Sequence, residues 1–254
     1  MRVMSAAMIE RPASNSLGMH RLLVTQRDPS IPAYRALGFL SQHSDGIFRF
    51  AYLREAVASS WFTPLPGLSR TDGGYSSSSL FPLFAERVIS PRRPDRVETM
   101  RALDLSTDAT PFEVLTRSGG RRVEDQIELT PVAVPDVGGR LEFDFLVHGV
   151  RYTTAEAQEL ITTLPVGHPL AIRHEPTNTF NPLARLVLEG EVSLGYVPDP
   201  LVRVVHRMTD LRASVLRANG PEVGYHMRLL VRLGGRVDGP APFTGPDWET
   251  VGDV

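Results

Sequence analysis

Five side chains in the second half of the chain have the chemistry that an unpaired nucleic acid strand requires. Tyr152 and Phe180 offer flat π faces on which bases can stack, and Arg151 offers a planar guanidinium for a phosphate. Asn178 and Asn181 carry amides that can hydrogen-bond a sugar hydroxyl or the edge of a base. Stacking contributes about 1–3 kcal/mol per base, so two such platforms support micromolar binding without a strongly basic surface.

Two residue types are absent, and each absence excludes classes of function. The sequence has no cysteine, which excludes disulfides, thiol nucleophiles and cysteine-bound zinc or iron–sulfur centres. It has no lysine either, since all 27 basic residues are arginine, and this excludes P-loops, kinase phosphate-binding lysines and Schiff-base chemistry. The seven histidines lack the spacing of metal ligands, and no Gly-x-Ser-x-Gly motif occurs. We therefore expect a protein that is not an enzyme and that has no metal and no cofactor.

Length and charge limit the architecture and the size of any nucleic acid site. The 254 residues, 42% hydrophobic and 22% charged, predict a folded protein of one large or two small domains. No apolar run approaches the roughly 18–20 residues that cross a bilayer, so we expect a cytoplasmic protein without a membrane span. The net charge of −2 favours a short site that contacts about 2–3 phosphates over a long groove that follows a duplex.

The first half of the chain predicts a mixed unit of strands and helices. Residues 1–18 show no periodicity and are expected to form a flexible tail, and the folded unit covers residues 19–134. Strands are predicted at residues 21–25, 46–52 and 126–130, a loop at 64–79, and helices at 79–89, 95–103 and 111–116. Capping boxes are expected at Asp95 with Glu98 and at Thr153 with Glu156.

The second half predicts a small barrel. Residues 135–140 (PDVGGR) are predicted to form a linker. In residues 141–235, apolar and polar residues alternate as they do in short strands. Strands are expected at residues 141–147, 170–174, 185–188, 192–197 and 227–233, with helices near 153–164 and 200–208. Residues 236–254 are expected to be a C-terminal tail in which Phe243 and Trp248 are docking points. The predicted fold class is α+β, mainly β.

Four sequence segments of the second unit carry a family resemblance. They are residues 148–152 (HGVRY), 165–172 (PVGHPLAI), 174–184 (HEPTNTFNPLA) and 194–198 (LGYVP). In this order and spacing, residues 141–233 resemble a HIRAN domain. That resemblance implies an OB-like barrel that binds single-stranded DNA or DNA 3′ ends, in a repair, mobile-element or defence context. Asn181 stands where the family favours an acidic residue; an amide can still bond a 3′ hydroxyl but does not repel a terminal phosphate.

Residues 20–134 resemble, through fewer features, the N-terminal small domain of HipA-type kinases. The matching segments are the serines at 76–79 before residues 80–87 (LFPLFAER), the stretch 111–115 (PFEVL), and residues 119–122 (GGRR) entering a strand. The resemblance implies a domain that docks a partner, because the kinase body is absent from this chain. A kinase-like protein is the partner that this resemblance implies, and the HIRAN resemblance implies a helicase-like one.

Alternative interpretations remain open for each of these residues. Tyr152 and Phe180 are equally typical of core residues in a small barrel, and Asn178 and Asn181 are typical of turn-capping side chains. The pairs Arg92-Arg93 and Arg121-Arg122 are more typical of surface salt bridges than of a nucleic acid contact. For the whole chain, the alternative to DNA binding is a protein-interaction subunit, similar to an antitoxin, whose first unit docks a kinase-like partner.

Overall fold

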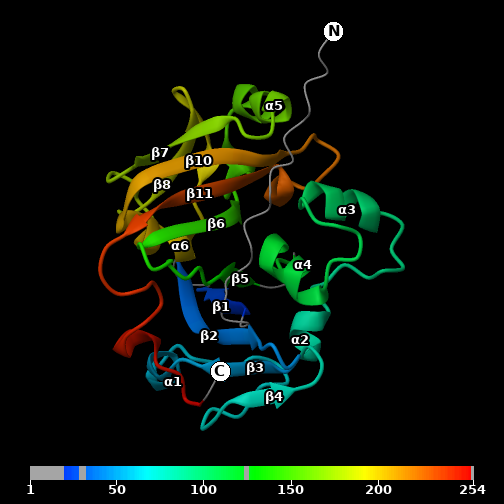
Figure 1. Cartoon of the computed structure of the whole chain (residues 1–254), viewed down its shortest axis with the longest axis vertical. Helices are drawn as coiled ribbons and strands as arrows, with labels where there is room; N and C mark the ends of the chain where they lie inside the picture. Colours follow the sequence, from blue (N-terminus) through cyan, green and yellow to red (C-terminus); the bar gives the residue numbers. More distant parts are fainter. Residues whose placement is uncertain (1–19, 29–32, 123–125, 253–254) are drawn as a thin grey trace.

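The computed structural model describes residues 20–28, 33–122 and 126–252, which form two antiparallel sheets one above the other along the long axis (Figure 1). The fold is α+β and mainly β, as predicted. No helix in this described part of the chain is long and apolar enough to cross a membrane. The elements in chain order are β1 (His20–Arg27), β2 (Tyr34–Gln42), β3 (Phe48–Tyr52), α1 (Arg54–Ala58), β4 (Tyr75–Ser77), α2 (Pro82–Ala85), α3 (Arg96–Ala102), α4 (Pro111–Ser118), β5 (Ile127–Pro131), β6 (Arg140–Leu146), η1 (Val150–Tyr152), α5 (Ala155–Thr163), β7 (Pro169–His174), β8 (Arg185–Glu189), β9 (Val192–Tyr196), α6 (Asp199–His206), β10 (Met208–Ala218), η2 (Tyr225–Met227), β11 (Leu229–Val237) and η3 (Pro246–Trp248).

The first sheet has the strand order β4-β3-β2-β1-β5. Strand β2 passes very close to β3 at Gly38, where a Cβ atom would lie 2.3 Å from the carbonyl oxygen of Ala51, so glycine is required there. Helix α4 packs beside β5 and begins at a complete capping box, in which Thr110 accepts from the amide of Glu113 and the Glu113 carboxylate accepts from the amide of Thr110. It ends at Gly119, whose φ of 70° is the left-handed conformation typical of a helix C-terminus.

The second sheet has the order β6-β11-β10-β7-β8-β9, and its two edge strands come together at one point. Just beyond β6, His148 and Tyr196 exchange backbone hydrogen bonds of 2.9 and 2.8 Å. This contact requires Gly195, because a Cβ there would lie 2.4 Å from the carbonyl oxygen of His148. A single bridge is not a ladder, so in the described residues the expected barrel is not closed.

The largest hydrophobic cluster joins the two sheets. Phe39 and Leu53 of the first sheet region belong to the same buried cluster as Phe143 and Val231 of the second. The segment after β11 returns to the first sheet, where the amide of Val251 donates to the carbonyl of Tyr52. On the way, Phe243 is buried and its ring lies 4.9 Å from that of Trp248. Residues 238–252 therefore pack against the body of the protein, with Phe243 and Trp248 as the contacts.

Several details differ from the sequence predictions, and one is the short strand β4, which lies within the loop predicted at residues 64–79. Strands β2 and β10 were also not predicted. The helix expected at residues 79–89 is confined to α2. It stops there because the Arg87 side chain donates to the carbonyls of Leu83 and Gly120 where the helix would continue. Asp95 precedes α3 without a side-chain capping bond. The cap of α5 is Thr154, one residue later than expected, and it accepts from the amide of Ala157.

Replacing Tyr52 with phenylalanine tests how the loop after β3 is held. The fully buried hydroxyl of Tyr52 donates to the carbonyl of Leu68 (2.8 Å) and accepts from the amide of Leu65 (2.7 Å). Tyr52→Phe leaves both buried backbone groups without this partner, so we expect a loss of about 1–3 kcal/mol in unfolding free energy by urea denaturation. Tyr225→Phe, at an exposed ring, is the control and should change stability by less than about 0.5 kcal/mol. Equal stability of the two variants would contradict this role of the hydroxyl.

Candidate nucleic-acid interface

The candidate interface lies at the end of the second sheet where β6, β7 and β9 finish. Two segments form it: η1, which follows β6, and the loop of residues 175–184 between β7 and β8, called here the 175–184 loop. Gly149 has a φ of 76° and lets the chain turn into η1 directly against the ring of Tyr196, where an added Cβ would lie 3.3 Å from the ring.

Tyr196 connects these two segments. Its ring faces Gly149, and its hydroxyl donates to the carboxylate of Glu175 at the start of the 175–184 loop (3.1 Å). Burial and the hydrogen bond to Glu175 raise the pKa of Tyr196, so the phenol stays protonated and keeps its donor at neutral pH. Glu175 also accepts from the amide nitrogen of Asn178 (2.6 Å), which extends the network into the loop. The sequence motif around Tyr196 is therefore a structural support for the interface.

Segment η1 and the 175–184 loop are together called here the rim. The three predicted contact side chains on this rim are exposed. Arg151 and Tyr152 lie in η1, and the ring of Tyr152 is 85% exposed. Phe180 lies in the 175–184 loop with 70% of its surface exposed. Neither ring is a core residue, so the alternative that they fill a barrel interior is wrong for this structure. Each exposed ring is therefore available to a ligand.

The two asparagines are held within the loop. Asn178 accepts at Oδ1 from the amides of Phe180 (3.0 Å) and Asn181 (3.1 Å). Asn181 accepts at Oδ1 from the amide of Leu183 (2.8 Å) and donates to Asp199 at the start of α6 (2.6 Å). These bonds are those of turn-capping side chains and fix the position of Phe180. Direct contact of either asparagine with DNA stays a prediction.

The first sheet reaches the rim through a contact between His148 and a buried carboxylate. The imidazole of His148 lies 2.9 Å from the carboxylate of Glu128, which is on β5, and the guanidinium of Arg121 lies 3.4 Å from the same ring. Burial opposes ionisation of Glu128, but the charge and hydrogen bond of His148 outweigh it and lower the pKa of Glu128. Burial and the neighbouring Glu128 raise the pKa of Tyr34 to about 12. Arg121 is exposed, so the first sheet adds a cation to this edge.

Sequence reasoning did not assign Arg121, Tyr225 or Arg228 to the interface. Tyr225 lies in η2, which packs against η1, and its ring is 43% exposed with the guanidinium of Arg228 at 5.3 Å from the ring centre. Arg121 was assigned to a surface salt bridge together with Arg122. Among the described residues, Arg122 makes one, to Glu86 (3.4 Å), and Arg121 does not. No sequence signal could have separated these neighbours, since both follow the same pair of glycines.

The other histidines near the rim are engaged elsewhere. His174 bonds the carbonyl of Pro182 (2.7 Å), and its ring packs edge-on against His206 at 5.6 Å. Burial, with the charges of Arg121 and His148, lowers the pKa of His226. Across residues 20–28, 33–122 and 126–252, no three His, Asp or Glu side chains are grouped in a way that could hold a metal ion.

Comparison with known proteins gives little beyond this geometry. No known protein family and no curated protein matches the sequence. Among solved structures, a protein from Lactobacillus plantarum is 20% identical over 39% of this chain and 99% of its own, with a TM-score of 0.31. The HIRAN domain of human HLTF is 15% identical over 40% of this chain and 81% of its own, with a TM-score of 0.26. Scores this low carry no argument about function, and the resemblance of the first unit to HipA-type kinases stays a prediction.

The Glu128–His148 pair predicts a specific dependence of stability on pH. A lowered pKa in the folded state means that the ionised carboxylate stabilises the fold above the ordinary pKa of 4.5 and that this contribution is lost as the pH falls below it. We expect Glu128→Gln to lower the melting temperature at pH 7, and the difference from wild type to shrink between about pH 5 and pH 3. Glu159→Gln, at an exposed site on α5, should follow the wild-type curve. Parallel curves for wild type and Glu128→Gln would contradict the assignment.

Proposed function

We propose that this protein is a non-enzymatic binder of single-stranded DNA or DNA ends, of the HIRAN type, and that the rim of the second sheet is its binding site. The observation that carries the proposal is the exposure of Tyr152 and Phe180 on two segments that Tyr196 and Glu175 connect. Each ring offers a face to a base, and stacking does not depend on sequence because every base has a π face.

The charges around the rim fit a short contact with the backbone of one strand. Arg151 is exposed beside Tyr152, and Arg121 is exposed beside His148 on the first sheet's side of η1. Guanidinium groups bind phosphates through paired N–H donors, and two of them match a site of about two phosphates. In this proposal the strand stacks on the aromatic rings while its backbone lies toward Arg151 and Arg121.

The 175–184 loop supplies a fixed platform. The bonds of Asn178 and Asn181 hold the backbone around Phe180 before any ligand arrives, so little conformational entropy is lost when a base stacks there. The repair, mobile-element or defence context implied by the family resemblance belongs to the proposal.

Substitution of the rim tests the site directly. We expect Phe180→Ala and Arg151→Ala each to weaken binding of a 12-nucleotide single strand several-fold, because a lost stack alone is worth about 1–3 kcal/mol. Fluorescence anisotropy with a labelled oligonucleotide measures this. Val166→Ala, at a 68% exposed apolar side chain away from the rim, is the control for Phe180, and Arg92→Ala is the control for Arg151. Unchanged affinity in both rim variants would defeat the site assignment.

Arg121 and Arg122 are neighbours in the sequence with different surroundings, so the substitution of one is a control for the substitution of the other. We expect Arg121→Ala to weaken single-strand binding and to reduce the salt dependence of log K by about 0.7, the slope that one phosphate contact contributes on a single strand. Arg122→Ala should change neither quantity, since its guanidinium pairs with Glu86. Titrations between 50 and 200 mM salt separate them. Identical slopes for the two variants would show that Arg121 makes no backbone contact.

A further inference from the structure

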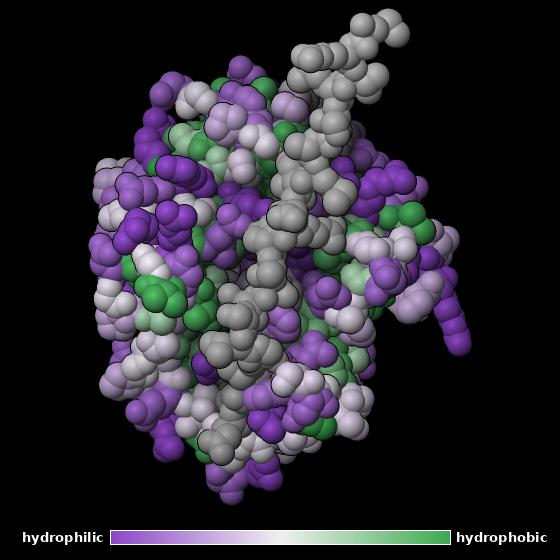
Figure 2. All heavy atoms as spheres, viewed as in Figure 1, coloured by the Kyte–Doolittle hydropathy of each residue, from purple (hydrophilic) through white to green (hydrophobic). Residues whose placement is uncertain are grey.

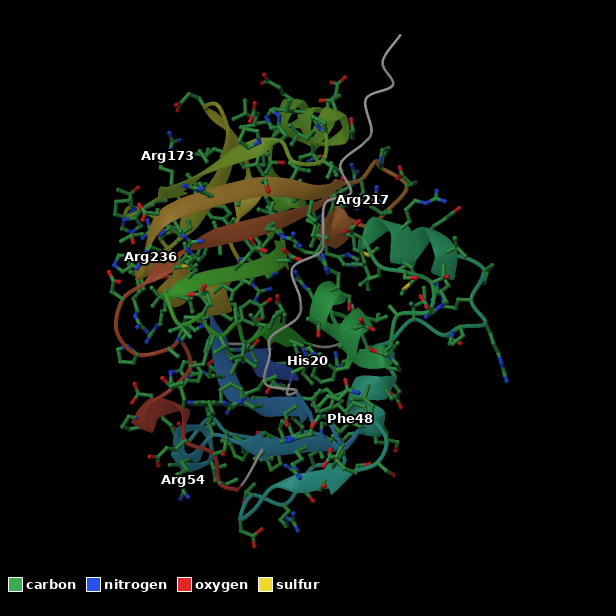
Figure 3. All side chains as sticks on the ribbon, viewed as in Figure 1. His20, Phe48, Arg54, Arg173, Arg217 and Arg236 are labelled. Atoms are coloured by element: carbon green, nitrogen blue, oxygen red, sulfur yellow. The ribbon has the colours of Figure 1, made fainter. Side chains whose placement is uncertain are left out.

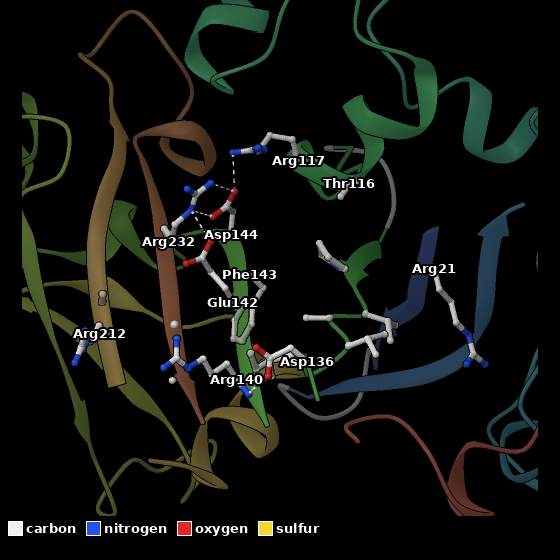
Figure 4. A pocket seen from close by; sticks show the side chains of 18 of the residues that line it. Arg21, Thr116, Arg117, Asp136, Arg140, Glu142, Phe143, Asp144, Arg212 and Arg232 are labelled. Atoms are coloured by element: carbon white, nitrogen blue, oxygen red, sulfur yellow. Dashed lines mark hydrogen bonds and ion pairs between the residues drawn. The ribbon is translucent and has the colours of Figure 1, made fainter. Parts of the chain in front are cut away.

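A second charged surface, separate from the rim, lies between the two sheets. It is an open groove of about 1110 Å³, called here the inter-sheet groove. One wall is made by α4, β1 and residues 131–136, and the other by the polar faces of β6, β11 and β10 (Figure 4). Hydrophilic side chains gather over β10 and β11 on the face shown in Figure 2.

One part of the groove is neutralised by its own ion pairs. Asp144 on β6 lies 3.1 Å from Arg117 of α4 and 2.9 Å from Arg232 of β11, and Arg232 also lies 3.5 Å from Glu142 (Figure 4). The hydrogen bond to Asp144 raises the pKa of Arg232. These bonds tie α4 to the second sheet, so this part of the groove serves the structure.

The other part holds three arginines without such partners. Arg140, Arg212 and Arg236 line the groove and are exposed, and their side chains make no hydrogen bond or ion pair within the described ranges 20–28, 33–122 and 126–252. Figure 3 places Arg236 at the end of the second sheet away from Arg217. The carboxylates lining this part are Asp136, which accepts from the amides of Gly138 and Arg140, and Asp210. Over the whole groove, six arginines and four carboxylates are among the described residues that line it, so cations exceed carboxylates.

The strand register concentrates this charge. Arg236 and Arg140 are direct partners across β11 and β6, and like charges in that position repel. Gly234 stands between Arg212 on one side and Glu142 on the other, and a Cβ atom at Gly234 would lie 3.8 Å from the Glu142 carboxylate. An anion that bridges Arg140 and Arg236 would remove the repulsion, and a guanidinium fork suits the oxygens of a phosphate.

We propose that the inter-sheet groove binds the phosphodiester backbone of a DNA segment beyond the end held at the rim. This inference rests on the proposed function. Strand β6 begins at Arg140 and ends at Leu146, so the arginines lie about 20 Å from the strand end that leads to η1. A strand stacked as in a duplex, at about 3.4 Å per nucleotide, must extend about six nucleotides beyond the rim to reach them.

The test is the affinity of the full-length protein for oligonucleotides of two lengths. We expect Arg140→Gln/Arg236→Gln to bind a trinucleotide as wild type does, but to bind a 20-nucleotide strand several-fold more weakly, with a salt slope smaller by about 1.4. The control, Arg54→Gln/Arg93→Gln, removes the same charge from two exposed arginines outside the groove. A larger loss of 20-nucleotide binding in the groove variant than in the control supports the groove, and an equal or smaller loss overturns it.

Two further measurements, of melting temperature and of peptide binding, separate this proposal from its alternatives. Because the Arg140–Arg236 pair is repulsive in the free protein, the groove variant should melt at the wild-type temperature or above it, and a lower melting temperature with weak DNA binding would overturn the assignment. A decaglutamate peptide tests an acidic protein partner: loss of its binding in the groove variant, with unchanged 20-nucleotide binding, also overturns it. Failure of wild type to bind the trinucleotide counts against the rim, and hence against the proposed function itself.

Discussion

The buried contact between Glu128 and His148 determines how the two halves of this protein work together. Glu128 belongs to an edge strand of the first sheet, and His148 follows an edge strand of the second. The backbone of His148 is also the one point at which the edge strands of the second sheet meet in the described residues. A buried carboxylate costs too much free energy to stand alone, so His148 cannot move away from the first sheet without exposing or protonating Glu128.

That constraint extends outward to the rim. Tyr196, bonded to the backbone of His148, packs on Gly149 and donates to Glu175, and Glu175 receives the side chain of Asn178. The chain of contacts thus runs from a buried charge to an exposed ring at Phe180. It explains why an aromatic side chain can remain open to solvent on an ordered loop: the loop is held from beneath by polar bonds, and the ring contributes little to the fold. The inter-sheet groove follows from the same arrangement, because the two sheets must face one another.

Sequence patterns predicted the parts of this architecture that are local. Alternation identified β6, and Pro111 with Gly119 identified both ends of α4. Strand β2 was missed because it is buried on both faces over much of its length and so lacks a two-residue period. Strand β10 was missed because two register shifts, after Thr209 and after Val215, interrupt its alternation.

For the candidate site, residue chemistry identified the exposed groups and could not identify their partners. Arg151, Tyr152 and Phe180 were predicted as contacts and are on the surface. The amides of Asn178 and Asn181 are used inside the loop, which a linear pattern cannot distinguish from contact with a ligand. The role of Arg121 depends on the packing of two sheets, and its identical neighbour Arg122 points to Glu86.

Photochemical cross-linking identifies the side chains that lie against the bases of a bound strand. A single-stranded oligonucleotide that carries 5-iodouracil, irradiated on the full-length protein and analysed by peptide mass spectrometry, reports which aromatic side chains lie against its bases. Because the bases stack on the rim, we expect adducts on Tyr152 and Phe180. Adducts confined to other aromatic residues, such as Trp61 or Tyr75, or cross-linking that persists undiminished after both rim rings are replaced, would contradict it.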